Sequence, residues 1–161
     1  MTTIILIITG VLTALVAGLF YAYSCSVVLG LGKLQDIEYL KAMQSINREI
    51  LNPVFFLSFM GTAIMLPVCT FLYRAHSPVF ILLLLATIIY LVGVFGVTMM
   101  GNVPLNDQLD QFNIGEATTD AVKKMRGVFE NKWNYLNMIR TLCSTMSIIL
   151  VICACIWAKT E

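Results

Sequence analysis

Two asparagines flank a proline in the segment GNVPLNDQL, residues 101–109, which follows a long apolar run. An amide group both donates and accepts hydrogen bonds, so Asn102 and Asn106 can satisfy backbone groups that Pro104 leaves without partners. The same amides can bind the polar edge of a small molecule. Polar side chains at membrane depth are costly unless they are paired, so their positions indicate where structure or chemistry requires them.

A second polar set lies in WNYLNMIR, residues 133–140. Trp133, Asn137 and Arg140 are spaced i, i+4 and i+7, which places them on one face of a helix. The guanidinium of Arg140 keeps its proton and must find an acceptor. We expect that acceptor to be a carboxylate. The first candidate is Asp107, followed by Glu49 or Glu130.

A third polar set, Asn47, Arg48 and Asn52, precedes another apolar run in INREILNP. Two interpretations of the three sets stay open. In the first, the side chains only cap and tie together three helices. In the second, they form a polar pocket at the lipid–water boundary, which suits a flat, weakly polar ligand arriving from the bilayer. Its aromatic walls would come from Tyr21, Tyr23, Trp133 and Tyr135.

Few other residues can act in catalysis. The single histidine, His76, lies in the short loop RAHSP, remote from the polar sets. The His, Cys and carboxylate residues lack metal-ligand spacing, and no phosphate-binding glycine loop or nucleophile elbow occurs. We therefore expect no metal and no cofactor. A general base would have to come from the polar sets, as Asp107 or Glu49.

Four uncharged segments must position these residues, and each is long enough to cross about 30 Å of hydrocarbon. They run over about residues 3–32, 53–73, 78–100 and 137–158. Of the 161 residues, 59% are hydrophobic and 12% are charged, which is typical of a membrane protein. Proline accounts for the starts at Pro53 and Pro78, Pro67 should kink the second segment, and Pro104 should end the third. We predict a single integral membrane domain, residues 1–161.

The connections predict helices outside the lipid. KLQDIEYLKAMQSINREILN has apolar residues at steps of three and four, which indicates an amphipathic helix with Asp36 as its N-cap. Similar spacing upstream of the last segment, from Val122 to Leu136, predicts that the fourth helix begins well outside the lipid. The short RAHSP loop makes the second and third helices antiparallel neighbours. The predicted fold is all-α: a four-helix transmembrane bundle whose amphipathic helical extensions form a cytoplasmic cap.

Basic residues predict the orientation. Eight of the ten Lys and Arg residues fall on the side of the two long connections, and Arg74 and Lys159 fall on the other. The positive-inside rule then places the long connections in the cytoplasm and both termini outside, in what we expect to be a bacterial inner (plasma) membrane. A net charge of +1 gives no electrostatic support for a nucleic-acid partner.

Small residues recur every four positions along the first segment. They are Gly10, Ala14, Gly18, Ala22, Ser26 and Gly30. Such a stripe lets another backbone approach closely in lipid. The neighbour is either another helix of the same bundle or a second protein, as in a homo-oligomer, and the sequence does not distinguish these alternatives.

In this order and spacing, AGLFYAYSCSVVLGLGKL, AMQSINREILNPVFF, GNVPLNDQL and WNYLNMIR resemble the anthrone-oxygenase-like family of small four-helix membrane proteins, mostly of unknown function. The resemblance implies oxygenation of polycyclic anthrones, in which an acidic C–H is deprotonated and the carbanion attacks dioxygen without an obligatory cofactor. Carried over to this chain, Arg140 and the amides would stabilise an enolate-like oxygen. The implied pocket residues are Asn102, Asn106, Trp133, Asn137 and Arg140.

The leading hypothesis is a membrane protein whose polar pocket binds a lipophilic aromatic molecule such as a quinol, with oxygenase-like activity on it. The catalytic candidates are Asp107 and Arg140. The candidates for substrate binding are Asn52, Asn102, Asn106, Trp133 and Asn137. The alternative is a non-enzymatic scaffold, or a subunit of a larger membrane complex, that assembles through the small-residue stripe. Transport is disfavoured because no pair of intramembrane carboxylates occurs and four helices are few for alternating access.

Overall fold

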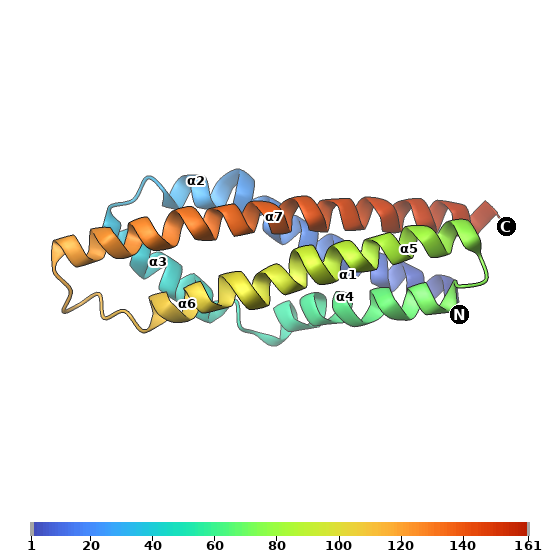
Figure 1. Ribbon diagram of the computed structural model, residues 1–161, viewed down its shortest axis with the longest axis horizontal. Helices are drawn as coiled ribbons and strands as arrows, with labels where there is room; N and C mark the ends of the chain where they lie inside the picture. Colours follow the sequence, from blue (N-terminus) through green and yellow to red (C-terminus); the bar gives the residue numbers. More distant parts are fainter. Residues whose placement is uncertain (1, 161) are drawn as a thin grey trace.

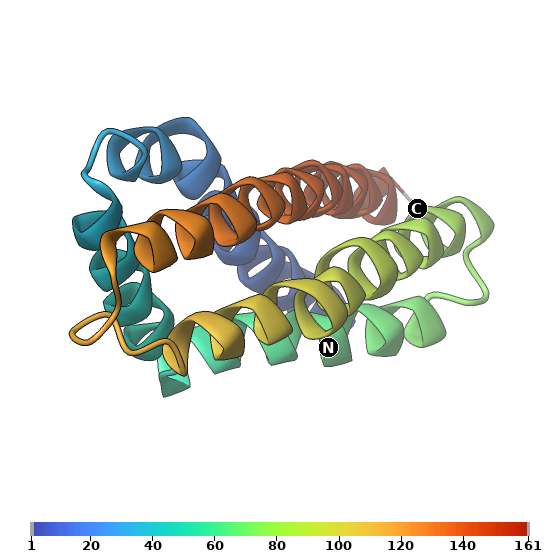
Figure 2. The same cartoon turned by 60° about the vertical axis from the view of Figure 1, so that its left-hand side comes forward.

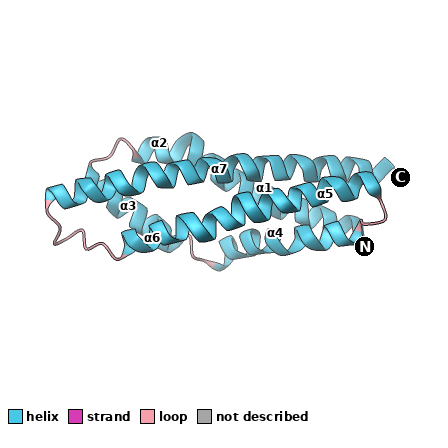
Figure 3. Ribbon diagram, viewed as in Figure 1, coloured by secondary structure: helices cyan, strands magenta, loops and turns pink. Residues whose placement is uncertain are grey.

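The computed structural model describes residues 2–160 as an elongated bundle of helices, and no strand occurs in that range (Figures 1 and 3). Four helical stretches are long and apolar enough to cross a membrane: Thr2–Leu31, Pro53–Leu72, Ser77–Asp110 and Thr119–Ala158. The chain is therefore an integral membrane protein, and the predicted all-α, four-helix fold is confirmed.

Two of these stretches combine α-helix with π-helix. Along the chain the elements are α1 (Thr2–Ala22), the π-helix η1 (Tyr23–Val27), α2 (Val28–Leu31), α3 (Asp36–Glu49), α4 (Pro53–Leu72), α5 (Ser77–Tyr90), the π-helices η2 (Leu91–Gly96) and η3 (Thr98–Asn102), α6 (Val103–Asp110) and α7 (Thr119–Thr160). The fourth helix begins at Thr119, well before its apolar part, as predicted. Both chain ends and the turn between α4 and α5 lie at one end of the bundle, and the two long connections lie at the other (Figures 1 and 2).

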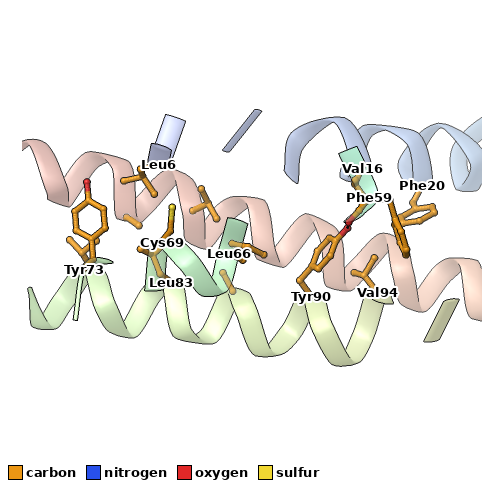
Figure 4. Packing of buried hydrophobic residues seen from close by; sticks show 14 residues of the cluster. Leu6, Val16, Phe20, Phe59, Leu66, Cys69, Tyr73, Leu83, Tyr90 and Val94 are labelled. Atoms are coloured by element: carbon orange, nitrogen blue, oxygen red, sulfur yellow. The ribbon is translucent and has the colours of Figure 1, made fainter. Parts of the chain in front are cut away.

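The core of the bundle is apolar and closely interleaved, with its buried side chains drawn from α1, α4, α5, η2 and α7 (Figure 4). Leu66, Leu83 and Val151 are fully buried there. Hydroxyl groups supply interhelical hydrogen bonds, which stabilise helix pairs in lipid. Thr70 and Thr87 bond at 2.9 Å, and the Tyr90 hydroxyl donates to the Phe59 carbonyl at 2.9 Å. The outward faces carry exposed aliphatic residues, as expected of surfaces in contact with lipid.

A second hydrophobic cluster holds a cap, which consists of α3, α6 and residues 119–136 of α7. Its buried members include Tyr39, Leu40 and Met43 of α3, packed against Phe129 of α7. Arg126 ties the α2–α3 connection to α7, because it donates to the carbonyls of Gly32 and Leu34 and to the carboxylates of Asp36 and Glu130. The predicted packing of the two amphipathic extensions against each other is confirmed.

Two predictions about helix ends are wrong. Asp36 is the first residue of α3, and the N-cap is Gln35, whose backbone N–H donates to the Glu38 carboxylate at 3.3 Å. Pro104 does not end the third helix, which continues to Asp110. The helix has π-type hydrogen bonding over Thr98–Asn102, where the Val103 N–H donates to the Thr98 carbonyl, and it passes through Pro104 into α6 without ending.

The small-residue stripe lies mainly on the outer surface of the bundle. Ala14, Gly18 and Ala22 are exposed, and a Cβ added at Gly18 would meet no atom within 4 Å. Gly10 alone approaches a neighbouring helix, since a Cβ there would lie 3.5 Å from Val151. Most of the stripe therefore does not serve helix packing within one chain.

Candidate functional site

A cavity of about 310 Å³ lies where the cap meets the membrane bundle. All four long helical stretches and α3 contribute to its wall. Most of the lining is apolar, and α4 supplies three aromatic rings, Phe55, Phe56 and Phe59. Phe59 stacks between Phe55 and Phe95, with ring centroids 5.1 and 5.6 Å apart. The stacked rings give the cavity one flat aromatic wall.

Arg140 of α7 brings a buried positive charge to this cavity. Its side chain is 5% exposed. It donates to the Asn137 Oδ1 at 2.9 Å and to the Thr98 hydroxyl at 3.5 Å. The guanidinium lies over the rings of Phe20 and Trp133, 4.4 and 5.3 Å from their centroids. Its partners are therefore neutral groups and aromatic faces.

The predicted ion pairs of Arg140 are wrong. Asp107 and Glu49 are exposed, whereas Arg140 is buried. Glu130 bonds instead to Arg126, one turn before it on α7. Asp107 sits on the outward face of α6, because the preceding residue, Asn106, is the one that points to the cavity.

Asn137 is oriented by a chain of hydrogen bonds that reaches η1. Its Nδ2 donates to the Ser24 hydroxyl at 2.9 Å, and Ser24 bonds to the Thr141 hydroxyl at 2.7 Å. With its nitrogen held there, the amide turns its oxygen toward Arg140. Ser24 thus fixes the Asn137 amide in the orientation that Arg140 requires.

Trp133 is held by a partner on the third helix. The indole N–H donates to the Asn106 Oδ1 at 3.0 Å, and the Tyr23 ring lies 5.8 Å from the Trp133 ring. The bond crosses from α7 to α6, so Asn106 and Trp133 form a rigid wall. The observed bond uses the amide oxygen of Asn106.

Three lining residues keep polar atoms without a hydrogen-bond partner. Both polar atoms of the Asn102 side chain, the Nδ2 of Asn47 and the Nε of Arg140 are buried and unpaired. Asn102 is 1% exposed. Leaving a buried polar group without a hydrogen bond costs about 1–3 kcal/mol. Several such groups beside one cavity therefore need an explanation other than helix packing.

Irregular helical turns help to place these groups. Tyr23 belongs to η1, Phe95 to η2, and Thr98 and Asn102 to η3, and all four line the cavity. A π-turn holds more residues than an α-turn, so it rotates the side chains that follow it, and such turns are frequent at functional sites. Two separate helices become π-helical beside the same cavity.

The structure brings together five of the predicted site residues and separates two. Lining the cavity are Asn102, Asn106, Trp133, Asn137 and Arg140. Asn52 instead caps α4, where its Oδ1 accepts from the backbone N–H groups of Val54 and Phe55 at 3.0 Å. Asp107 is exposed and outside the lining. Of the expected aromatic walls, Tyr23 and Trp133 line the cavity and Tyr21 and Tyr135 are exposed.

Sequence reasoning missed the phenylalanines of the wall and Thr98. Phe55 and Phe59 are four residues apart on α4, a spacing that places both rings on one face. The i, i+4 spacing of these phenylalanines is visible in the sequence, but the same spacing is common in helices that face lipid. Among residues 2–160, no group of three or more His, Cys, Asp or Glu side chains is arranged to hold a metal ion.

A family model described as Anthrone oxygenase matches residues 55–150. No curated protein and no solved structure matches the chain. The matched range is more than half of the chain. It contains the third helical stretch and most of the second and fourth, including Asn102, Asn137 and Arg140.

Proposed function

The chain belongs to the anthrone oxygenase family, and on that basis we propose that it binds a flat, lipophilic aromatic molecule in the cavity and oxygenates it. The observation that carries the proposal is a buried arginine whose partners are neutral, beside an unpaired Asn102 amide, in a mostly apolar cavity. A ligand with one polar oxygen edge and a large apolar body complements that arrangement.

The chemistry of an anthrone-like substrate matches these groups. Loss of a proton from its methylene carbon gives a carbanion whose charge is delocalised onto the ring oxygen as an enolate. A guanidinium and an amide N–H aimed at that oxygen stabilise the charge most strongly where water is excluded. Arg140 and Asn102 are the two groups that we assign to this oxygen, while the aromatic wall of α4 supports the rings.

Oxygenation then follows with dioxygen as the oxidant. The carbanion bonds to dioxygen and, after protonation, forms a hydroperoxide on the ring carbon. Breaking the remaining C–H and the O–O bond leaves a carbonyl and releases water, so CH₂ and O₂ become C=O and H₂O. The substrate carbon is oxidised and one oxygen atom is reduced to water. Because the cavity lining has neither carboxylate nor histidine, we assign the proton to a single water molecule bound inside the cavity, with Arg140 increasing the acidity of the bound C–H.

An assay with anthrone tests this proposal. Purified protein in lipid nanodiscs should convert anthrone to anthraquinone, followed by absorbance, with one dioxygen consumed per turnover. Arg140→Gln should lower the rate by about 10²-fold, the usual effect of removing one oxyanion donor. Arg48→Gln makes the same charge change at an exposed arginine of the cap and should leave the rate unchanged. A normal rate in well-folded Arg140→Gln protein would refute the site.

We further propose that the cap faces the cytoplasm of a bacterium and that both termini lie outside. Support comes from the excess of Lys and Arg on the cap side. In this orientation the cavity lies at the boundary between the cytoplasmic leaflet and the cap.

The outward stripe on α1 favours a second candidate, a scaffold or complex subunit that assembles through this face. Gly18→Leu with Ala22→Leu should leave the monomer folded, because a side chain added at position 18 meets open space. If the stripe is an interface, chemical cross-linking in membranes should detect oligomers of the wild type and lose them in this variant. Oligomers that persist in the variant would exclude the stripe as the interface.

A further inference from the structure

The wall of the cavity is asymmetric. Its polar side is closed, since Asn102, Asn137 and Arg140 are at most 5% exposed. The lining residues that are exposed lie elsewhere: Leu51 in the α3–α4 connection (64%), and, deeper along the membrane helices, Phe56 and Met60 of α4 and Met99 of η3 (43%, 40% and 49%). These side chains, all apolar, therefore border an opening between the cavity and the surface of the bundle, with Phe56, Met60 and Met99 on its membrane-spanning part.

That opening lies at membrane depth. Phe56 and Met60 belong to the second membrane-spanning helix and Met99 to the third. Met60 is seven residues beyond Pro53, which corresponds to about 10 Å along the helix axis. The exposed neighbours Val54, Leu57 and Met100 are also apolar. A surface of this composition within two membrane spans contacts lipid acyl chains.

The cap covers the end of the cavity that would otherwise meet water. Ile46 and Asn47 of α3 line this end, and the same helix packs through Tyr39, Leu40 and Met43 into the buried cluster of the cap. Trp133, which is 4% exposed, joins that cluster to the cavity wall. On this side the edge of the opening is Leu51, an apolar side chain just before the second membrane helix.

We infer that the cavity is loaded from the bilayer, through a lateral portal between α4 and η3 bordered by Phe56, Met60 and Met99. The ligand class is an uncharged polycyclic aromatic that dissolves in acyl chains and carries one oxygen edge, which reaches Arg140 on the far side of the cavity. The nature of the ligand rests on the proposed function, whereas the portal does not. Two methionines suit this position because their unbranched side chains adapt to a passing ring.

Trp133 reports on the portal without any ligand. The chain has two tryptophans, so Trp157→Phe leaves Trp133 as the only one, with Trp157→Tyr as a second choice if the first variant folds poorly. The protein is reconstituted in phosphatidylcholine vesicles with or without bromine atoms on the acyl chains. We expect brominated acyl chains to quench Trp133 fluorescence and aqueous acrylamide to have little effect.

Paired substitutions then narrow the portal. Met60→Phe with Met99→Phe should abolish quenching by brominated lipid and slow the entry of anthrone from the vesicle membrane by about tenfold, which corresponds to about 1.4 kcal/mol. Val54→Phe with Leu57→Phe is the matched control, because both positions are exposed on α4 and outside the lining. This control should behave as the parent protein.

The outcomes separate the portal from the activity. Quenching by acrylamide but not by brominated lipid, or equal quenching in the narrowed and control variants, would overturn the portal even if anthrone is oxidised. Quenching that the narrowed variant loses, in protein that neither binds nor oxidises anthrone, would support the portal and refute the proposed function.

Discussion

At the scale of single residues, the site depends on side chains whose hydrogen bonding is incomplete. Trp133 is satisfied by Asn106, and Asn137 by Ser24 and Arg140. Asn102 stands apart, because both of its polar atoms are buried and unpaired. Helix packing alone would favour an apolar side chain of similar size at this position. An amide retained under that penalty is more easily explained by a ligand than by the fold.

Replacing Asn102 with leucine should therefore separate stability from binding. Removing a buried unsatisfied amide should leave the protein equally stable or more stable, by up to about 1–3 kcal/mol. The affinity for anthrone should fall, since the amide that we assign to the oxygen edge is lost. Unfolding in detergent by a denaturant series and ligand quenching of Trp133 measure the two effects. Lower stability with unchanged affinity would show that Asn102 has only a structural role.

At the scale of elements, the third membrane helix changes its hydrogen-bond pattern where it meets α7. The π-helical turns of η2 and η3 lie between α5 and α6 and face the cavity. Small residues permit a close approach there. A Cβ added at Gly101 would lie 2.8 Å from the Leu136 side chain, and one added at Gly93 would lie 2.8 Å from the Cβ of Cys143. The π-helical segment is thus fitted tightly against α7.

Gly93→Ala should destabilise the bundle by about 1–3 kcal/mol, because overpacking forces helices apart or side chains off their rotamers. Gly127→Ala is the control, since no atom lies within 4 Å of the added methyl and alanine favours a helix. Denaturant unfolding in detergent compares the two variants with the parent. Combining Gly93→Ala with Cys143→Ala should recover part of the loss, and equal stability of both single variants would contradict the tight fit.

At the scale of the whole molecule, two hydrophobic cores lie one after the other along the bundle, with the cavity between them. The membrane core includes Leu83 and Tyr90, and the cap core includes Tyr39 and Phe129. Burial, reinforced by nearby Glu130, raises the pKa of the Tyr39 phenol, which therefore stays neutral at ordinary pH. Arg126 is the main polar tie within the cap.

Arg126→Leu should loosen the cap while the membrane bundle stays folded. The variant loses hydrogen bonds to two carbonyls and two carboxylates, and charged hydrogen bonds contribute about 1.5–3 kcal/mol each before solvent screening. Hydrogen exchange should accelerate over residues 32–40 and stay slow in α5. Lys123→Leu, at an exposed position on the same helix, should change neither region. Uniformly faster exchange would contradict an independent cap.

The orientation of the molecule follows from charge and has its own test. A reporter enzyme that is active only outside the cytoplasm should be active when fused after the last residue. The same reporter fused in the α6–α7 connection, near Gly115, should be inactive. The opposite pattern would place the cap outside and contradict the positive-inside rule for this chain.

Much of the architecture could be predicted because hydropathy and periodicity act locally. Lipid requires long uncharged helices, so the four spans were readable from composition, and apolar spacing identified α3 and the extension of α7. Helix ends were less predictable. Pro104 suggested that the third helix ends there, but the helix continues past the proline, with π-type hydrogen bonds in the turn before it. The N-cap is Gln35 and not Asp36, because Glu38 accepts from the Gln35 N–H and Asp36 accepts from Arg126 instead.

The sequence by itself determined which polar side chains lie near the membrane boundary, since the amides and Arg140 stand where the long apolar segments begin or end. Only the tertiary structure decided how they are used. It turned Asp107 and the small-residue stripe outward, made Asn52 a helix cap, and left Arg140 buried among neutral groups. The physical reason is rotational: which way a side chain points depends on helix packing and on π-turns that shift every later residue, and neither is encoded in residue type alone.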